Sequence, residues 1–233
     1  GFNGDVYSLA LFNTGLYAGG NFTISDGLPV KRLARLVVNN WTAVGFGMDD
    51  GAVHCMRVYS NSLYIGGTFT TIGGSTTNRI ARWNGTNWSA MGSGLNDDVN
   101  ALVVFSGSII AGGNFSMPGG SDNVARWNGS SWGTMGNGLT GGGGDRVNAL
   151  TVMGSNLVAG GRFEQSGSND ISNVAKWNGS SWSEFKNDNF DDDVNALVVF
   201  NGELYVGGDF NHIGINDRKY ITKWNGSNWV SVG

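Results

Sequence analysis

One pattern recurs five times along this chain of 233 residues, and the copies follow one another directly. Each copy opens on a valine-led apolar segment, continues to a Gly-Gly pair and an aromatic residue, and closes on a tryptophan. The opening valines lie 46 to 48 residues apart, at Val6, Val53, Val99, Val147 and Val194. A repeat of this length is one supersecondary unit, and its apolar faces are buried only by its neighbours. The sequence therefore predicts an array of five similar units.

Each unit contains four short strand signals, which the last copy shows most clearly. They cover residues 194–200, 203–210, 220–224 and 228–232, and Asn201-Gly202 between the first two suits a two-residue hairpin turn. No segment keeps a 3.6-residue apolar period, so we expect almost no helix. Four-stranded units that cover one another's faces form a β-propeller when they close into a ring.

We therefore predict an all-β, five-bladed β-propeller with four antiparallel strands in each blade. The predicted blades are residues 1–46, 47–93, 94–139, 140–187 and 188–233. The first copy begins with a first strand and the last copy ends with a fourth strand. Closure is therefore expected to be in phase, by packing of the first blade on the last, without a swapped strand.

The tryptophans recur at fixed offsets in the repeat. Trp83 and Trp88 flank one turn, so they are expected on the same face of a hairpin, beside Ala81 and Ala90. Large residues that alternate with small ones are typical of surfaces that pack against each other. We interpret the nine tryptophans mainly as a core between blades rather than as platforms for sugars.

The repeat resembles known families. Val-Asn-Ala-Leu at 194–197, Leu-Tyr-Val-Gly-Gly-Asp-Phe at 204–210 and Ala-Lys-Trp-Asn-Gly-Ser-Ser-Trp at 175–182 are the segments that carry the resemblance. They resemble kelch-like, galactose-oxidase-type propeller repeats, and repeats of secreted bacterial proteins and of fungal cortical polarity-marker proteins. The resemblance implies an extracellular or cell-surface setting and blades ordered from an innermost first strand to an outermost fourth strand. It implies no catalytic residues.

Composition excludes several classes of function. The net charge is −4 and no basic stripe occurs, so we expect no nucleic-acid binding. No run of about 18 apolar residues occurs, so we expect no membrane insertion. The chain has one cysteine and two histidines, and no nucleophile–base set is recognisable, so we expect no enzymatic activity.

Acidic and amide side chains cluster where one unit leads into the next, on the rim that would surround the channel mouth. The candidate ligand-binding residues are Asp50, Asp98, Asp145, Asp193, Asn100, Asn148, Asn195 and His212. Such oxygen-rich loops can bind a hard cation, and Asp98 and Asp193 are the places where calcium would be sought. The alternative, which we favour, is that Asp and Asn form turns here, so no metal or cofactor is predicted.

Four Asn-Gly-Ser/Thr sequons recur in the turn between the third and fourth strands, at Asn84, Asn128, Asn178 and Asn225. They are candidate glycosylation sites in a eukaryotic secretory pathway.

The loops between the second and third strands differ most between copies, and variable loops on a regular scaffold are where specificity usually resides. We predict a non-enzymatic binding or scaffold module that recognises a protein or a glycan through these rim loops, within a larger multidomain or repeat chain. The alternative is a lectin-like propeller with several related carbohydrate sites.

Overall fold

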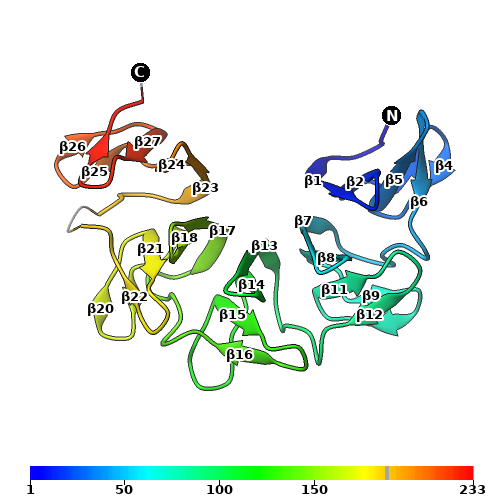
Figure 1. The fold of residues 1–233 in the computed structure, drawn as a ribbon, viewed down its shortest axis with the longest axis horizontal. Coiled ribbons are helices and arrows are strands. Elements are labelled where there is room, and N and C mark those ends of the chain that lie inside the picture. Colours follow the sequence, from blue (N-terminus) through cyan, green and yellow to red (C-terminus); the bar gives the residue numbers. More distant parts are fainter. Residues whose placement is uncertain (187–188, 233) are drawn as a thin grey trace.

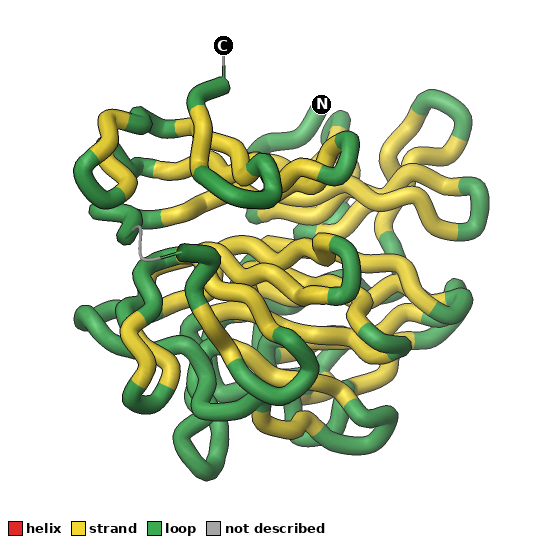
Figure 2. The backbone as a smooth tube through the Cα atoms, turned by 60° about the vertical axis from the view of Figure 1, so that its left-hand side comes forward, coloured by secondary structure: helices red, strands yellow, loops and turns green. Residues whose placement is uncertain are grey.

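The computed structural model describes residues 1–186 and 189–232, and in this range the chain is built of strands, turns and loops without helix (Figure 2). The described strands include five four-stranded antiparallel sheets, and each sheet is formed by consecutive segments of one repeat. We call these sheets blades one to five. The order inside each blade follows the sequence, as the four strand signals predicted.

The first strands of the blades line the inside of an arc, and the fourth strands lie outermost (Figure 1). The first strands are β1 (Val6–Phe12), β7 (Val53–Tyr59), β13 (Val99–Phe105), β17 (Arg146–Met153) and β23 (Val194–Phe200). The second strands are β2 (Gly15–Gly20), β8 (Ser62–Gly67), β14 (Ser108–Gly113), β18 (Asn156–Arg162) and β24 (Glu203–Gly208). The third strands are β5 (Leu33–Val37), β11 (Ile80–Trp83), β15 (Val124–Trp127), β21 (Val174–Trp177) and β27 (Ile221–Trp224). The fourth strands are β6 (Asn40–Ala43), β12 (Trp88–Ala90), β16 (Trp132–Thr134), β22 (Trp182–Ser183) and β28 (Trp229–Val230).

Four blades carry a short hairpin between the second and third strands. These hairpins are β3 (Ile24–Ser25) with β4 (Leu28–Pro29), β9 (Thr71–Ile72) with β10 (Ser75–Thr76), β19 (Gln165–Ser166) with β20 (Asn169–Asp170), and β25 (His212–Ile213) with β26 (Asn216–Asp217). The segment that leads into each of these blades bridges to its hairpin, as Met48 does to Ile72 and Phe190 to Ile213. The loops between blades and the loops between second and third strands therefore share one rim, as expected.

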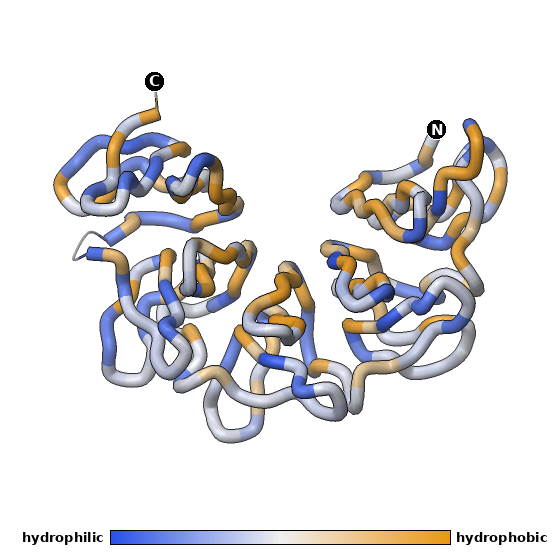
Figure 3. Tube along the Cα trace, viewed as in Figure 1, coloured by the Kyte–Doolittle hydropathy of each residue, from blue (hydrophilic) through white to orange (hydrophobic). Residues whose placement is uncertain are grey.

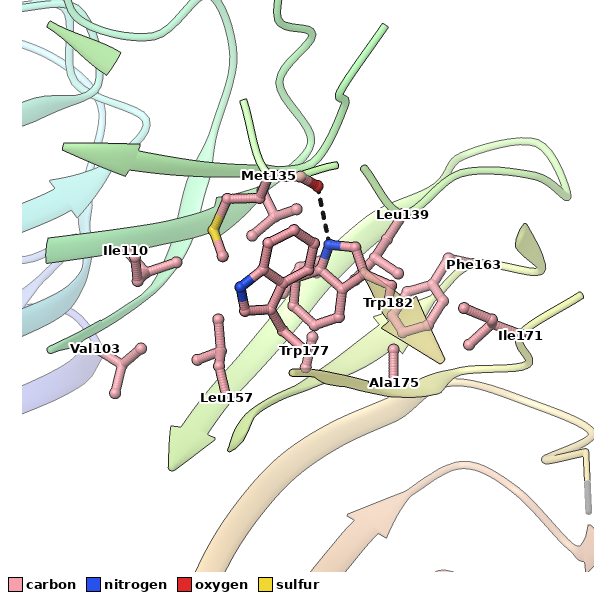
Figure 4. Close-up of a cluster of buried hydrophobic side chains, with 13 residues drawn as sticks. Val103, Ile110, Met135, Leu139, Leu157, Phe163, Ile171, Ala175, Trp177 and Trp182 are labelled. Carbon is pink, nitrogen blue, oxygen red and sulfur yellow. Dashed lines mark hydrogen bonds between the residues drawn. The ribbon is translucent and has the colours of Figure 1, made fainter. Parts of the chain in front are cut away.

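Four of the apolar clusters lie between blades, and a fifth, which includes Phe22 and Ala34, lies within blade one. One cluster joins Met135 and Leu139 of blade three to Leu157, Trp177 and Trp182 of blade four (Figure 4). Comparable clusters join blades one and two, two and three, and four and five. Hydropathy follows this plan, with apolar residues concentrated in the strands that line the inside of the arc (Figure 3).

The tryptophan pairs behave as the sequence predicted. Trp83 pairs with Trp88 across the hairpin, and Ala81 pairs with Ala90 two positions away. Trp83 is only 7% exposed. These indoles therefore belong to the cores between blades.

The predicted closure of the ring is not present in this structure. Blades one and five stand at opposite ends of an open arc, with the two chain ends on either side of a gap (Figure 1). Val6 of β1 is 42% exposed, whereas Val53, Val99, Val147 and Val194 at the same place in the other blades are fully buried. Four seams between blades are thus formed, and the fifth is open.

Candidate binding rim

Asp and Asn side chains fasten the rim loops to the scaffold. The first oxygen of Asp50 accepts hydrogen bonds from the backbone N–H groups of Thr70 (2.7 Å) and Thr71 (3.3 Å). Equivalent bonds run from Thr23 and Ile24 to Asn3, from Ser116 to Asn96, and from Asn211 and His212 to Asp191. Short polar side chains that satisfy nearby backbone N–H groups are typical of ordered turns. Asp50 therefore has a structural role that accounts for its position.

The register of the first two strands shifts immediately after the opening valine of every blade. A bulge of this kind re-aims the side chain of the extra residue. The re-aimed residues are Tyr7, His54, Asn100, Asn148 and Asn195.

Three of these bulge residues, His54, Asn100 and Asn148, hydrogen-bond to the next blade along the inside of the arc. Asn148 Nδ2 donates to the carbonyl of Val194 (3.1 Å) and to Asn195 Oδ1 (3.2 Å), both in blade five. Asn100 Nδ2 donates to the carbonyl of Val147 at 3.4 Å. The structure thus brings the three predicted asparagines to the inner strands, where they connect neighbouring blades.

Two of the predicted aspartates have basic partners. Asp193 is buried and forms ion pairs with Arg146 and, at 3.6 Å, with Arg162. Asp98 is half-buried, and its carboxylate lies 3.6 Å from Arg79. Burial, followed by the neighbouring charge of Asp97, raises the pKa of Asp98 above its usual value, and Arg79 only partly offsets this effect.

A polar hollow of about 380 Å³ opens on the rim where blade three meets blade four. Its lining includes Asp97, Asp122 and Asp145 and contains no lysine or arginine. The structure thus places the predicted Asp145 beside two acidic residues that were not among the predicted binding residues. Asp122 comes from the loop between the second and third strands of blade three, which carries no hairpin. The variability of that loop between repeats was the only feature of the sequence that pointed to Asp122 as a binding residue.

The three carboxylates are held in place by their own loops. One oxygen of each accepts a backbone N–H: Asp98 donates to Asp97 (2.8 Å), Met117 to Asp122 (3.0 Å) and Gly141 to Asp145 (2.8 Å). In the described part of the chain, the second oxygen of each accepts no protein hydrogen bond. The hollow can therefore receive a ligand that supplies hydrogen-bond donors.

No set of three or more His, Cys, Asp or Glu side chains within residues 1–186 and 189–232 is close enough to hold a metal ion. The calcium considered at Asp98 and Asp193, which was not the favoured interpretation, has no ligand set in the described residues.

His212, the remaining candidate, lies at the start of the hairpin of blade five. Its Nδ1 is 2.9 Å from Asp191 Oδ2, and its Nε2 is 3.0 Å from Asp217 Oδ1. Burial acts to raise the pKa of Asp191, but hydrogen bonds from the backbone and ring of His212 outweigh it, and the pKa is lowered. The imidazole bridges two loops and lies in a different blade from the acidic hollow.

A second kind of hollow recurs on the outer side of blades two, three and four, beside the second tryptophan of each repeat. The hollow next to Trp88 measures about 240 Å³, and those next to Trp132 and Trp182 about 720 and 510 Å³. Serine and asparagine side chains line all three, and threonine lines the first two.

The four sequons occupy exposed turns between the third and fourth strands. The Oδ1 of Asn84 accepts backbone N–H groups from Thr86 and Asn87, and Asn128, Asn178 and Asn225 repeat this pattern. The glycine that follows each has φ between 100° and 108°, which explains Asn-Gly as turn chemistry.

Comparison with protein families adds the decisive observation. Residues 1–154 match the model of the Rax2 C-terminal beta propeller domain. The chain belongs to this family. Membership in the Rax2 propeller family confirms the predicted resemblance to propeller repeats of cortical markers. A comparison with curated proteins gives no match.

Two solved structures share the fold over nearly the whole chain. The computationally designed Ika8 protein aligns with a TM-score of 0.57 at 14% identity, over 96% of this chain and 60% of its own. The extracellular domain of a putative hybrid two-component system from B. thetaiotaomicron aligns with a TM-score of 0.61 at 13% identity, over 98% of this chain and 28% of its own. The chain thus spans less than two thirds of either relative. Across the described residues, no helix has the length and apolarity that crossing a bilayer requires.

Proposed function

We propose that this Rax2-family propeller is a non-enzymatic binding or scaffold module of an extracellular or cell-surface protein, and that it recognises a protein or a glycan through its rim. One observation carries the proposal. Three carboxylates, each with one oxygen anchored by its own loop, line one open hollow between blades three and four.

The chemistry of this hollow defines the ligand class. Carboxylate oxygens accept hydrogen bonds from hydroxyl, ammonium and guanidinium groups, and charge-assisted bonds are about twice as strong as neutral ones. The ligand is therefore rich in donors: sugar hydroxyls, or lysine and arginine side chains of a protein. Anchored side chains lose little conformational freedom on binding, which favours affinity.

The surface setting has two supports. One similar solved structure is described as an extracellular domain. The four sequons lie on exposed turns, where an oligosaccharide can be attached without unfolding the blade.

The second candidate function is a lectin-like propeller with several related sites. The outer hollows beside Trp88, Trp132 and Trp182 favour it, because they repeat with the blades and are rich in hydroxyl and amide groups. Against it, Trp182 is only 2% exposed and offers little indole face to a sugar.

A glycan array, read with and without calcium, separates the candidates. The double variant Asp97→Asn/Asp145→Asn should lose saccharide binding if the rim hollow is the site. Asp192→Asn is the matched control, because Asp192 accepts the next backbone N–H as Asp97 does (2.8 Å) but belongs to blade five. Loss of binding on substitution in the outer hollows alone would favour the lectin-like alternative.

A protein ligand is tested by photo-cross-linking from Asn114, which lines the rim hollow and none of the three outer hollows. The expected result is a defined partner that cross-links to the wild-type chain and to Asp192→Asn but not to the double variant. The proposal is wrong if neither saccharide binding nor cross-linking responds to Asp97 and Asp145.

A further inference from the structure

The four formed seams share one contact. A glycine late in the second strand lies under the opening valine of the next blade. A Cβ atom built on Gly19, Gly66, Gly112 or Gly160 would lie 2.5 Å from Cγ1 of Val53, Val99, Val147 or Val194, respectively. This contact is too close for any side chain, so the repeat requires glycine here.

The fifth glycine of the series has no valine over it. Among the described residues, a Cβ atom on Gly207 would meet only ordinary contacts, the carbonyl of Tyr220 at 3.7 Å and Ala196 at 3.9 Å. Blade five nevertheless keeps the glycine that a following blade requires.

The rest of this face of blade five is uncovered in the same way. Ile221 is 48% exposed, whereas Leu33, Ile80 and Val124 at the same position are fully buried. Val198 and Phe200 on the first strand are 56% and 60% exposed. A contiguous apolar face of this kind marks an interaction surface.

Blade one presents the complementary face. Val6, Leu9 and Leu11 on β1 are 42%, 61% and 76% exposed. In the formed seams, the residues at the positions of Val6 and Leu9 pack on the preceding blade, as Val194 and Leu197 do over Gly160. The chain thus has a valine without a glycine beneath it at one end, and a glycine without a valine at the other.

We propose that both uncovered faces are completed by further blades of the same repeat in one continuous polypeptide, so that the full propeller has more than five blades. The partner chemistry follows from the four formed seams, which all use the same glycine–valine contact. A single array that closes the gap covers both faces at once. A second copy of this chain is not favoured, because the gap is narrower than the five-bladed arc itself (Figure 1).

Extended chains test the proposal. Gly92 and Gly233 hold the same place in their repeats, and residues 93–136 are the repeat that follows Gly92. One to four copies of residues 93–136 are therefore appended in phase after Gly233. In these chains Gly207→Ala should lower the apparent Tm by roughly 5 °C, the loss also expected for Gly160→Ala, because a valine now covers it. In the 233-residue chain, Gly207→Ala should leave Tm unchanged. A large loss in the unextended chain, or no loss in any extended chain, would overturn the proposal.

Closure of the ring has its own readout. In a Cys55→Ala background, Leu11→Cys should react quickly with a soluble thiol reagent in chains that have too few added repeats to close the ring. At the copy number that closes the ring, its reaction should be at least about tenfold slower. Fast reaction at every copy number contradicts closure.

A second copy is tested in the unextended chain by oxidising Val6→Cys/Gly207→Cys in the same background. The expected product is uncrosslinked monomer. A disulfide-linked dimer would assign the faces to a second copy, and an internal disulfide would assign them to self-closure. Either result overturns the proposal.

Discussion

The indole Nε1 of Trp182 in blade four donates a 3.0 Å hydrogen bond to the carbonyl oxygen of Met135 in blade three (Figure 4). Trp132 makes the same bond to Met91 across the preceding seam, at 3.1 Å. Trp88 holds the corresponding place in blade two, but its buried Nε1 has no hydrogen-bond partner. The same residue type at the same position of the repeat thus has a polar contact across two seams and none across a third.

This difference predicts unequal effects of one substitution. Trp182→Phe removes the indole and leaves the Met135 carbonyl unpaired, so it should lower the free energy of unfolding by about 1–2 kcal/mol more than Trp88→Phe does. Both changes remove the same side-chain volume, which makes Trp88→Phe the control. Denaturant titration gives both values. Equal losses would show that the bond does not stabilise the seam.

The rim has a pH dependence that can be attributed to one carboxylate. Burial acts to raise the pKa of Asp50, but the hydrogen bonds from Thr70 and Thr71 outweigh it, so the pKa in the folded protein lies below the ordinary value of 3.8. The ionised form therefore stabilises the fold fully above the unfolded pKa of 3.8, and this stabilisation is lost as pH falls through the lower folded value.

Asp50→Asn tests this attribution, because Asn3 and Asn96 make the same kind of bond in other blades. The β9–β10 hairpin should stay in place in the variant. The variant should not show the loss of hairpin stability at low pH that protonation of Asp50 causes in the wild-type chain. Hydrogen exchange of residues 70–77 between pH 5 and pH 3 measures it. A wild-type and a variant hairpin with the same pH dependence would contradict the assignment.

Cys55 should be unreactive in the native chain. Its side chain is buried against blade three, and burial raises the pKa of the thiol, so both access and thiolate formation are suppressed. Ala196 holds the same position in blade five but is exposed. Ala196→Cys in a Cys55→Ala background should therefore react with a thiol reagent at least about a hundredfold faster than Cys55. Similar rates would mean that the face of blade five is covered.

The sequence was sufficient for the parts of the fold that depend on local period and on turn chemistry. Valine-led segments, Gly-Gly pairs and Asn-Gly turns recur at fixed offsets, and each is a local requirement of a strand, a close approach or a tight turn. The cross-strand pairing of Trp83 with Trp88 followed from the same reasoning. The absence of helix in the described residues agrees with the lack of a 3.6-residue period.

Closure could not be predicted in this way, because it depends on the angle between successive blades. That angle is set by the packing of whole faces, and repeat counting does not contain it. The binding rim could be predicted only in part, for a related reason. Asp145 was named, but its meeting with Asp97 and Asp122 depends on how two loops of different blades approach each other.

The same glycine–valine contact recurs at each of the four formed seams, and a series of five alanine substitutions tests what it contributes. Gly19→Ala, Gly66→Ala, Gly112→Ala and Gly160→Ala should each lower the apparent Tm by roughly 5 °C, because a Cβ atom would lie 2.5 Å from the valine of the next blade. Gly207→Ala should leave Tm within about 1 °C of the wild-type chain. A Gly207→Ala variant as unstable as the other four, or four variants as stable as Gly207→Ala, would contradict it.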